Sequence, residues 1–178
     1  MSKRNNLVFK ALHVVAWVIF VGLCVEAGGL IVNFIFSMFK PEVVGNLYQK
    51  LDLSKMYQQS ELAFFAIYGF LLVISVLKAV LFYILIMLLH KLDLSRPFDT
   101  YVASKITIIA YYTFSIGIIS LIARQVANDL LHQGYETDKL NQFWEDGQAF
   151  ILMAAVVYII AQIFKRGVEL QMDNDLTV

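Results

Sequence analysis

The sequence predicts an all-α integral membrane protein, a four-helix bundle, and its composition is the first reason. Of its 178 residues, 60% are apolar and 16% are Asp, Glu, Lys or Arg. Soluble domains have roughly 45–50% apolar and about 25% charged residues, so a water-soluble surface is excluded, as are disordered and collagen-like chains. The 14 basic residues balance the 14 acidic ones, which excludes direct binding of nucleic acid through a basic excess.

Four long apolar runs are the second reason. The runs from Lys10 to Lys40 and from Glu61 to His90 each enclose a single charge, and two further runs of 18 residues, 106–123 and 147–164, enclose none. Spanning ~30 Å of hydrocarbon takes about 20 helical residues, and continuous apolar runs do not fit the alternation of barrel strands. We expect one membrane domain, 1–178, with spans at about 8–38, 61–90, 104–132 and 146–171 and a cytoplasmic tail at 172–178.

The connecting segments predict short helical elements on the outer face. The first span runs on to Phe39, too far for a signal-peptide core of 7–15 residues, so we expect an uncleaved helix. Pro41 suits the first turn of a helix. The apolar residues after it recur at helical spacing and predict an amphipathic helix lying on the membrane: Val43, Val44, Leu47, Tyr48 and Leu51. Farther along, Trp144 is predicted to lie in the interfacial aromatic belt.

The basic residues predict the orientation. With the N-terminus inside, the inner side carries eight of them: Lys3, Arg4, Lys10, Lys91, Arg96, Lys105, Lys165 and Arg166. The outer side then carries five: Lys40, Lys50, Lys55, Arg124 and Lys139. The positive-inside rule therefore favours cytoplasmic N- and C-termini.

Each predicted span has one stripe of small or polar residues, and we expect the four stripes to meet in the bundle interior. In chain order the stripes are Gly22, Glu26, Gly29, Asn33 and Ser37; Leu71, Ser75, Lys78 and Leu85; Ala110, Thr113, Gly117, Ser120 and Arg124; Ala155, Tyr158 and Gln162.

Glu26 and Lys78 are the formally charged residues deep within the predicted spans. Because intramembrane charges need partners, we expect an ion pair or water-bridged contact between them, with Asn33 and Ser75 as secondary partners. One interpretation is a structural lock that sets the helix register, and the other is an ion or proton site. His13 and His90 are expected near each other at the inner ends of the first two spans.

No enzyme chemistry is predicted. The sequence contains no nucleophile elbow, Walker loop or dinucleotide fingerprint. The three histidines have no ligand spacing, and Cys24 is the single cysteine, so we expect no metal site, disulfide or cofactor.

The C-terminus ends on an acidic and apolar segment, Asp173, Asn174, Asp175, Leu176, Thr177 and Val178. Such a tail can present a strand or its carboxylate to a partner, and the alternative is a frayed terminus. This ending, together with the inner loop Leu94-Ser95-Arg96-Pro97-Phe98-Asp99, resembles a bacterial membrane family catalogued as domain of unknown function 2975.

The resemblance implies four spans in a bacterial plasma membrane and no established reaction. It also implies a helix-turn-helix regulator as a partner, because genes of this kind often neighbour such regulators. Our first hypothesis is a non-enzymatic membrane protein that binds a cytoplasmic partner through residues 165–178 and loop 91–105. The alternative is a small transporter, immunity or resistance factor that uses the region around Glu26 and Lys78.

Overall fold

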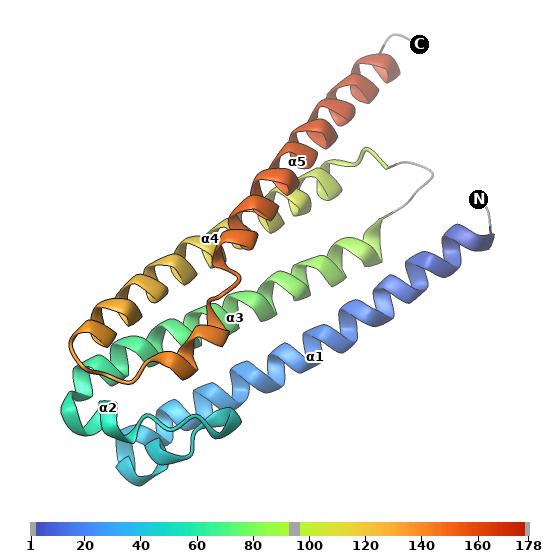
Figure 1. Ribbon diagram of the computed structural model, residues 1–178. Helices are drawn as coiled ribbons and strands as arrows, with labels where there is room; N and C mark the ends of the chain where they lie inside the picture. Colours follow the sequence, from blue (N-terminus) through green and yellow to red (C-terminus); the bar gives the residue numbers. More distant parts are fainter. Residues whose placement is uncertain (1–2, 93–96, 177–178) are drawn as a thin grey trace.

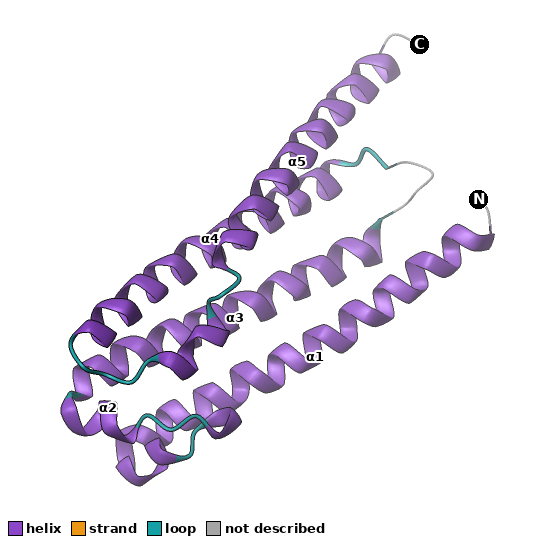
Figure 2. Ribbon diagram, viewed as in Figure 1, coloured by secondary structure: helices purple, strands orange, loops and turns teal. Residues whose placement is uncertain are grey.

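The computed structural model describes residues 3–92 and 97–176, and this part of the chain is helical without a β-strand (Figures 1 and 2). Four long helices dominate: α1 (Lys3–Phe39), α3 (Glu61–Lys91), α4 (Thr100–His132) and α5 (Gly147–Leu176). Short elements lie in the connections: η1 (Pro41–Gly45), η2 (Tyr48–Lys50), α2 (Ser54–Gln59) and η3 (Asp138–Phe143). All four long helices are long and apolar enough to cross a membrane. The predicted all-α four-helix membrane fold is therefore confirmed.

The long helices pack in chain order. α1 packs on α3, α3 packs on α4, and α4 packs most extensively on α5. Figure 1 shows α1 and α5 on opposite sides, close to the other helices at one end and far apart at the end that carries both termini. We call these the cap end and the terminal end. The outer helices α1 and α5 are accordingly the least buried of the four.

Side-chain caps set where two of the helices begin. The hydroxyl oxygen of Ser60 accepts a hydrogen bond from the Ala63 backbone N–H at the start of α3. The Asp99 carboxylate accepts from the N–H groups of Tyr101 and Val102 at the start of α4. Both caps satisfy donors that the first helical turn leaves unpaired.

Two segments, 40–60 and 133–146, form the cap. The first is not the predicted amphipathic helix on the membrane surface. It consists of the short 3₁₀ elements η1 and η2 followed by α2, and the chain turns at Gln49 and Lys50, both with φ of 58°. Its apolar residues Val44, Leu47 and Leu51 turn inward and are at most 3% exposed. They pack against the ends of the long helices, so burial in this core replaces burial in lipid.

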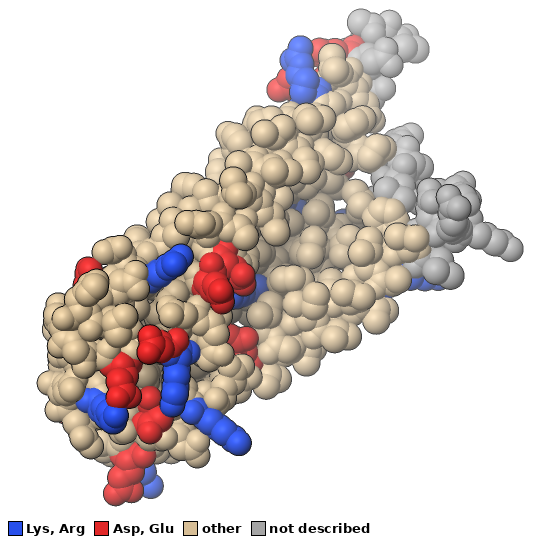
Figure 3. All heavy atoms as spheres, in the orientation of Figure 1, with Lys and Arg blue, Asp and Glu red and all other residues tan. Residues whose placement is uncertain are grey.

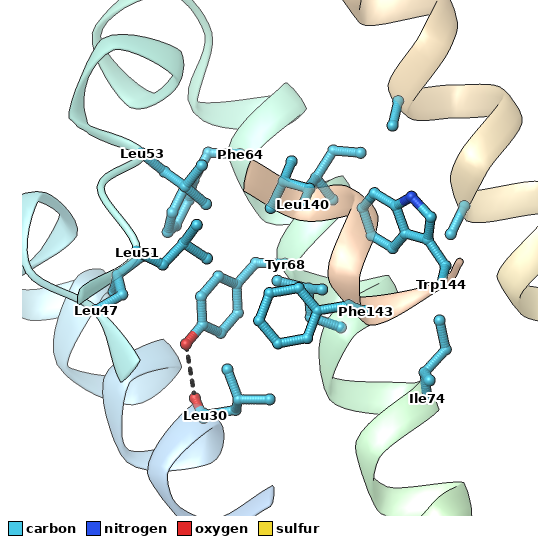
Figure 4. Packing of buried hydrophobic residues seen from close by; sticks show 14 of the residues in the cluster. Leu30, Leu47, Leu51, Leu53, Phe64, Tyr68, Ile74, Leu140, Phe143 and Trp144 are labelled. Atoms are coloured by element: carbon cyan, nitrogen blue, oxygen red, sulfur yellow. Dashed lines mark hydrogen bonds between the residues drawn. The ribbon is translucent and has the colours of Figure 1, made fainter. Parts of the chain in front are cut away.

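The main hydrophobic core lies beneath the cap (Figure 4). Its centre is Tyr68, whose ring lies beside Phe64 and whose hydroxyl donates to the Leu30 carbonyl of α1 at 3.2 Å. Trp144 also belongs to this core and is 1% exposed. Its predicted place in the interfacial belt, where the ring would face lipid headgroups, is therefore wrong, because the indole is packed inside the core, near Ile74 of α3 (Figure 4).

Small residues carry the packing between α4 and α5. A Cβ atom on Gly117 would lie 3.0 Å from the Gly147 carbonyl oxygen, and one on Gly147 would lie 2.9 Å from the Ser120 Cβ. The two backbones therefore approach closely at this crossing, as small residues permit in membrane helices. Nearer the terminal end a smaller cluster follows, with Val102, Ile106 and Ala161 buried.

Candidate functional site

Glu26 and Lys78 do not form the predicted direct ion pair in the part of the chain that the structure describes. The Lys78 Nζ instead lies 5.7 Å from the centroid of the Phe150 ring on α5. Helical phase explains the difference. Lys78 shares a face of α3 with Leu71, two turns away, whereas α3 meets α1 through Tyr68 and Tyr83 on another face. A water-bridged contact stays a prediction.

The secondary partners bond elsewhere. Ser75 is buried, and its hydroxyl donates to the carbonyl of Leu71 at 2.9 Å within its own helix. Asn33 is half-buried. None of the four candidates therefore bonds to another, and no shared polar cluster forms in this region.

The predicted interior stripes are buried in some helices and not in others. In α4, Ala110, Thr113, Gly117 and Ser120 are buried as predicted, while Arg124 at the cap end is exposed. In α3, Leu71 and Ser75 are buried, with Lys78 and Leu85 half-buried.

The stripes of the two outer helices lie beside the faces that are actually buried. α1 buries Ala16, Ala27 and Leu30, so of its predicted stripe only Ser37 is buried. α5 buries Ala154 and Ala161, while Ala155, Tyr158 and Gln162 are exposed. These helices have one main neighbour each, and the polarity of the stripes does not reveal which face meets it.

The two histidines behave as predicted. The His13 and His90 rings lie with centroids 6.2 Å apart between α1 and α3, and the Trp17 Nε1 donates to the His13 Nε2 at 3.1 Å. Among the described residues, no group of three or more His, Cys, Asp or Glu side chains has the geometry of a metal site. The pair therefore reads as an aromatic contact at the terminal end of the two helices.

The C-terminal segment continues α5 instead of forming a separate tail. The helix runs through Asp173, Asn174 and Asp175 to Leu176, beyond the predicted end at 171. Thr177 and Val178 lie outside the described residues, as do the side chains from Asn174 onward. α5 therefore extends 12 residues past Phe164, and Figure 1 shows this extension reaching beyond the start of α4.

An open hollow lies on this extension. It has a volume of about 770 Å³ and is lined by Phe98, Ile163, Arg166, Gly167, Leu170 and Gln171. Leu170 is 56% exposed. The lining of the hollow combines apolar side chains with Arg166 and Gln171. The Arg166 guanidinium donates to the Glu169 carboxylate of the same helix at 2.7 Å.

Phe98 attaches the α3–α4 connection to this surface. Its ring lies 5.6 Å from that of Phe164, and a Cβ atom on Gly167 would lie 2.3 Å from it. Gly167 therefore leaves the space that the ring occupies. Sequence reasoning singled out the Pro97-Phe98 turn but not Gly167; a glycine inside a charged helical segment was the available signal.

The cap gathers much of the charge visible on the face shown in Figure 3. Lys55 of α2 pairs with Glu136 from the other cap segment, and both side chains are exposed. The hydrogen bond from Lys55 to Glu136 raises the pKa of the Lys55 amine. Hydrogen bonds from the Ser54 hydroxyl and N–H lower the pKa of the Asp52 carboxyl. The Lys55–Glu136 pair connects the two cap segments, and the Ser54–Asp52 bonds stabilise the turn before α2 within the first segment.

The comparisons agree with the resemblance seen in the sequence. A family model described as protein of unknown function (DUF2975) matches residues 46–178. The match includes α3, α4, α5 and the hollow, and leaves α1 with Glu26 and Asn33 outside. No curated protein and no solved structure matches the chain. The chain, a multi-pass membrane protein by its four apolar helices, belongs to the DUF2975 family.

Proposed function

We propose that this protein is a non-enzymatic regulatory component of a bacterial plasma membrane, with both termini cytoplasmic, that binds a cytoplasmic protein at the terminal end of α5. The observation that carries the proposal is the 12-residue extension of α5, whose hollow is lined by residues that include Phe98, Gly167 and Leu170. A hollow that combines apolar side chains with a charged one such as Arg166 fits a protein–protein contact.

The position of the hollow supports a partner in water. Lys165 and Arg166 directly follow the 18 uncharged residues 147–164, so the hydrocarbon layer ends near them. Leu170 and Met172 lie beyond that boundary and are 56% and 59% exposed. The proposed partner is a helix-turn-helix regulator that inserts an apolar side chain into the hollow, held near the membrane by this contact.

The transport alternative gains no support from the geometry, because Lys78 lies beside Phe150 of α5 and makes no ion pair with Glu26 of α1 in the described part of the chain. It stays a prediction from the sequence.

Co-purification from detergent extracts of native membranes tests the proposal. The Leu170→Glu variant places a charge in the hollow and should lose the bound regulator, whereas Met172→Glu, equally exposed but outside the hollow, is the matched control and should retain it. Deleting residues 173–178 tests the tail separately. The proposal would be refuted if neither the Leu170→Glu variant nor the deletion variant reduced the recovery of any co-purifying protein.

A further inference from the structure

α5 provides a measure of where the hydrocarbon layer lies. Its residues 147–164 include no Asp, Glu, Lys, Arg or His, and they are bracketed by Glu145 and Asp146 on one side and Lys165 and Arg166 on the other. Eighteen residues of α-helix span about 27 Å, close to the ~30 Å thickness of the layer. Gly147 and Phe164 therefore mark its two boundaries.

Contacts with α5 show which residues of α4 and α3 lie at the level of the cap-side boundary. Gly147 lies against Gly117 and Ser120 of α4, so Ser120 is at the boundary. Phe150, one turn inside it, lies beside the Lys78 amine of α3. Since a lysine stem reaches toward the interface, the amine of Lys78 is placed near the boundary and not at the midplane.

Contacts at the terminal end give the same relative heights of α3 and α5. Phe164 contacts Phe98, just before the first turn of α4. Leu92, the residue directly after α3, packs on the cluster of Val102 and Ala161. Leu92 follows Lys78 by 14 residues, as Phe164 follows Phe150. The two helices therefore cross the same layer with the same length.

The contacts of α1 with α3 place the same boundary on α1. Phe20 lies beside Tyr83, and Leu30 accepts from Tyr68, so the level of Lys78 falls between positions 20 and 30 of α1. Glu26 lies in that interval, within about two helical turns of the boundary. A carboxylate near an interface reaches water, which explains how Glu26 is accommodated although it makes no ion pair with any residue in the described ranges 3–92 and 97–176.

A large part of the protein remains beyond this boundary. It comprises residues 28–39 of α1, 61–74 of α3 and 121–132 of α4, together with the cap segments 40–60 and 133–146. Most of the main hydrophobic core belongs to it, including Phe64, Tyr68 and Trp144. Apolar burial of this kind is driven by exclusion of water, a force that lipid does not supply between helices.

The exposed side chains of α4 change character at the same level. Tyr111, Phe114 and Ile118 are exposed before Ser120, as expected for a surface that faces lipid. After Ser120 the exposed residues of α4 are mainly polar, namely Arg124, Gln125, Asn128, Asp129 and His132, with Ile122 and Leu131 as the apolar ones.

We propose that the cap and the three helix ends form a folded lobe in water, and that the bilayer ends at the level of Lys78, Ser120 and Gly147. The long helices are thus only partly transmembrane. The outward side of α1 in the lobe stays apolar. Its exposed residues are Ile31, Val32, Ile35, Phe36, Met38 and Phe39. A tilt of the bundle toward α1 by ~20°, the average for membrane helices, brings that side to the headgroup region.

Thiol accessibility tests the lobe in the full chain. Cys24→Ala removes the single native cysteine. Single cysteines are then introduced at exposed positions: Ala66→Cys and Gln125→Cys in the lobe, Tyr83→Cys and Ile118→Cys in the layer, and Gln58→Cys as a reference in the cap. Membrane fragments open on both sides are treated with a membrane-impermeant maleimide, so the result does not depend on orientation.

Ala66→Cys and Gln125→Cys should react at rates near that of Gln58→Cys, and Tyr83→Cys and Ile118→Cys more than about tenfold more slowly, because a thiol in hydrocarbon does not ionise. All five should react in detergent. The proposal is overturned if Ala66→Cys and Gln125→Cys are as protected as Ile118→Cys in membranes, since the layer would then extend to the ends of α3 and α4.

Discussion

The lobe and the membrane-spanning part of the same helices are stabilised in different ways. In the lobe, large side chains such as Phe64, Tyr68 and Leu140 are fully buried. In the spanning part, α4 and α5 meet through Gly117, Gly147 and other small residues, and many large apolar side chains face outward. The contrast teaches that apolar content alone does not locate a core. Where water surrounds the chain, large side chains turn inward, and where lipid surrounds it, backbone approach sets the packing.

The largest expected effect comes from a cavity in the lobe core. Phe64 is 0% exposed, and its ring lies 5.2 Å from that of Tyr57 and 5.5 Å from that of Tyr68. Phe64→Ala should lower the free energy of unfolding by about 3–5 kcal/mol, measured by denaturant unfolding in detergent. Phe164→Ala, a half-buried position at the terminal end, is the control. An equal loss in both variants would contradict the contrast between the two regions.

Overpacking at the α4–α5 crossing comes next. A Cβ atom on Gly117 would lie 2.6 Å from the Ile151 Cγ1 and 3.0 Å from the Ile151 backbone nitrogen. Because backbone cannot move aside cheaply, Gly117→Ala should cost about 1–3 kcal/mol of stability.

The control for this substitution is Gly22→Ala, whose added methyl group meets no atom within 4 Å. It should leave stability unchanged or raise it by up to about 1 kcal/mol, as alanine favours the helix. If the Gly117→Ala protein were as stable as the Gly22→Ala protein, α4 and α5 would not approach each other as closely at Gly117 as the structure shows.

A smaller effect is expected at Trp144, whose Nε1 is buried without a hydrogen-bond partner among the described residues. Trp144→Phe loses contact area but removes a donor whose unpaired burial costs about 1–3 kcal/mol. The net change should stay within about 1 kcal/mol, whereas Trp144→Ala should lose about 3–5 kcal/mol. Thermal unfolding of both variants measures the difference, and similar losses would argue against an unsatisfied indole.

The smallest effect is a pH dependence in the cap. The hydrogen bonds from Ser54 lower the pKa of Asp52 below its ordinary value of 3.8, so this carboxylate stabilises the folded state above that value and the contribution is lost as pH falls through the lower, folded pKa. The stability difference between the native chain and Asp52→Asn should therefore shrink as pH is lowered from about 6 to 3. A constant difference in melting temperature would contradict the assignment.

Much of the fold is predictable because it depends on local properties. Apolar runs longer than a bilayer form helices in any context that lacks water, and the caps at Ser60 and Asp99 act within a single turn. The buried face of α4 is predictable as well, since small residues such as Gly117 are needed wherever backbones meet.

The candidate site is less predictable. Lys78 and Glu26 have the complementary charges of an ion pair, but pairing depends on which faces of α1 and α3 meet, and Tyr68 and Tyr83 decide that. Gly167 becomes meaningful once Phe98, far away in the sequence, is seen to occupy its surface.

The sequence by itself determined the class, the number of long helices and their approximate ends, because composition and helical rise act residue by residue. Only the tertiary structure decided that the segment 40–60 folds inward, that Trp144 is buried and that Lys78 turns toward α5. Those outcomes depend on contacts between segments distant in the chain, where a rotation of one helix by a single residue exchanges the face that is buried for the one that is exposed.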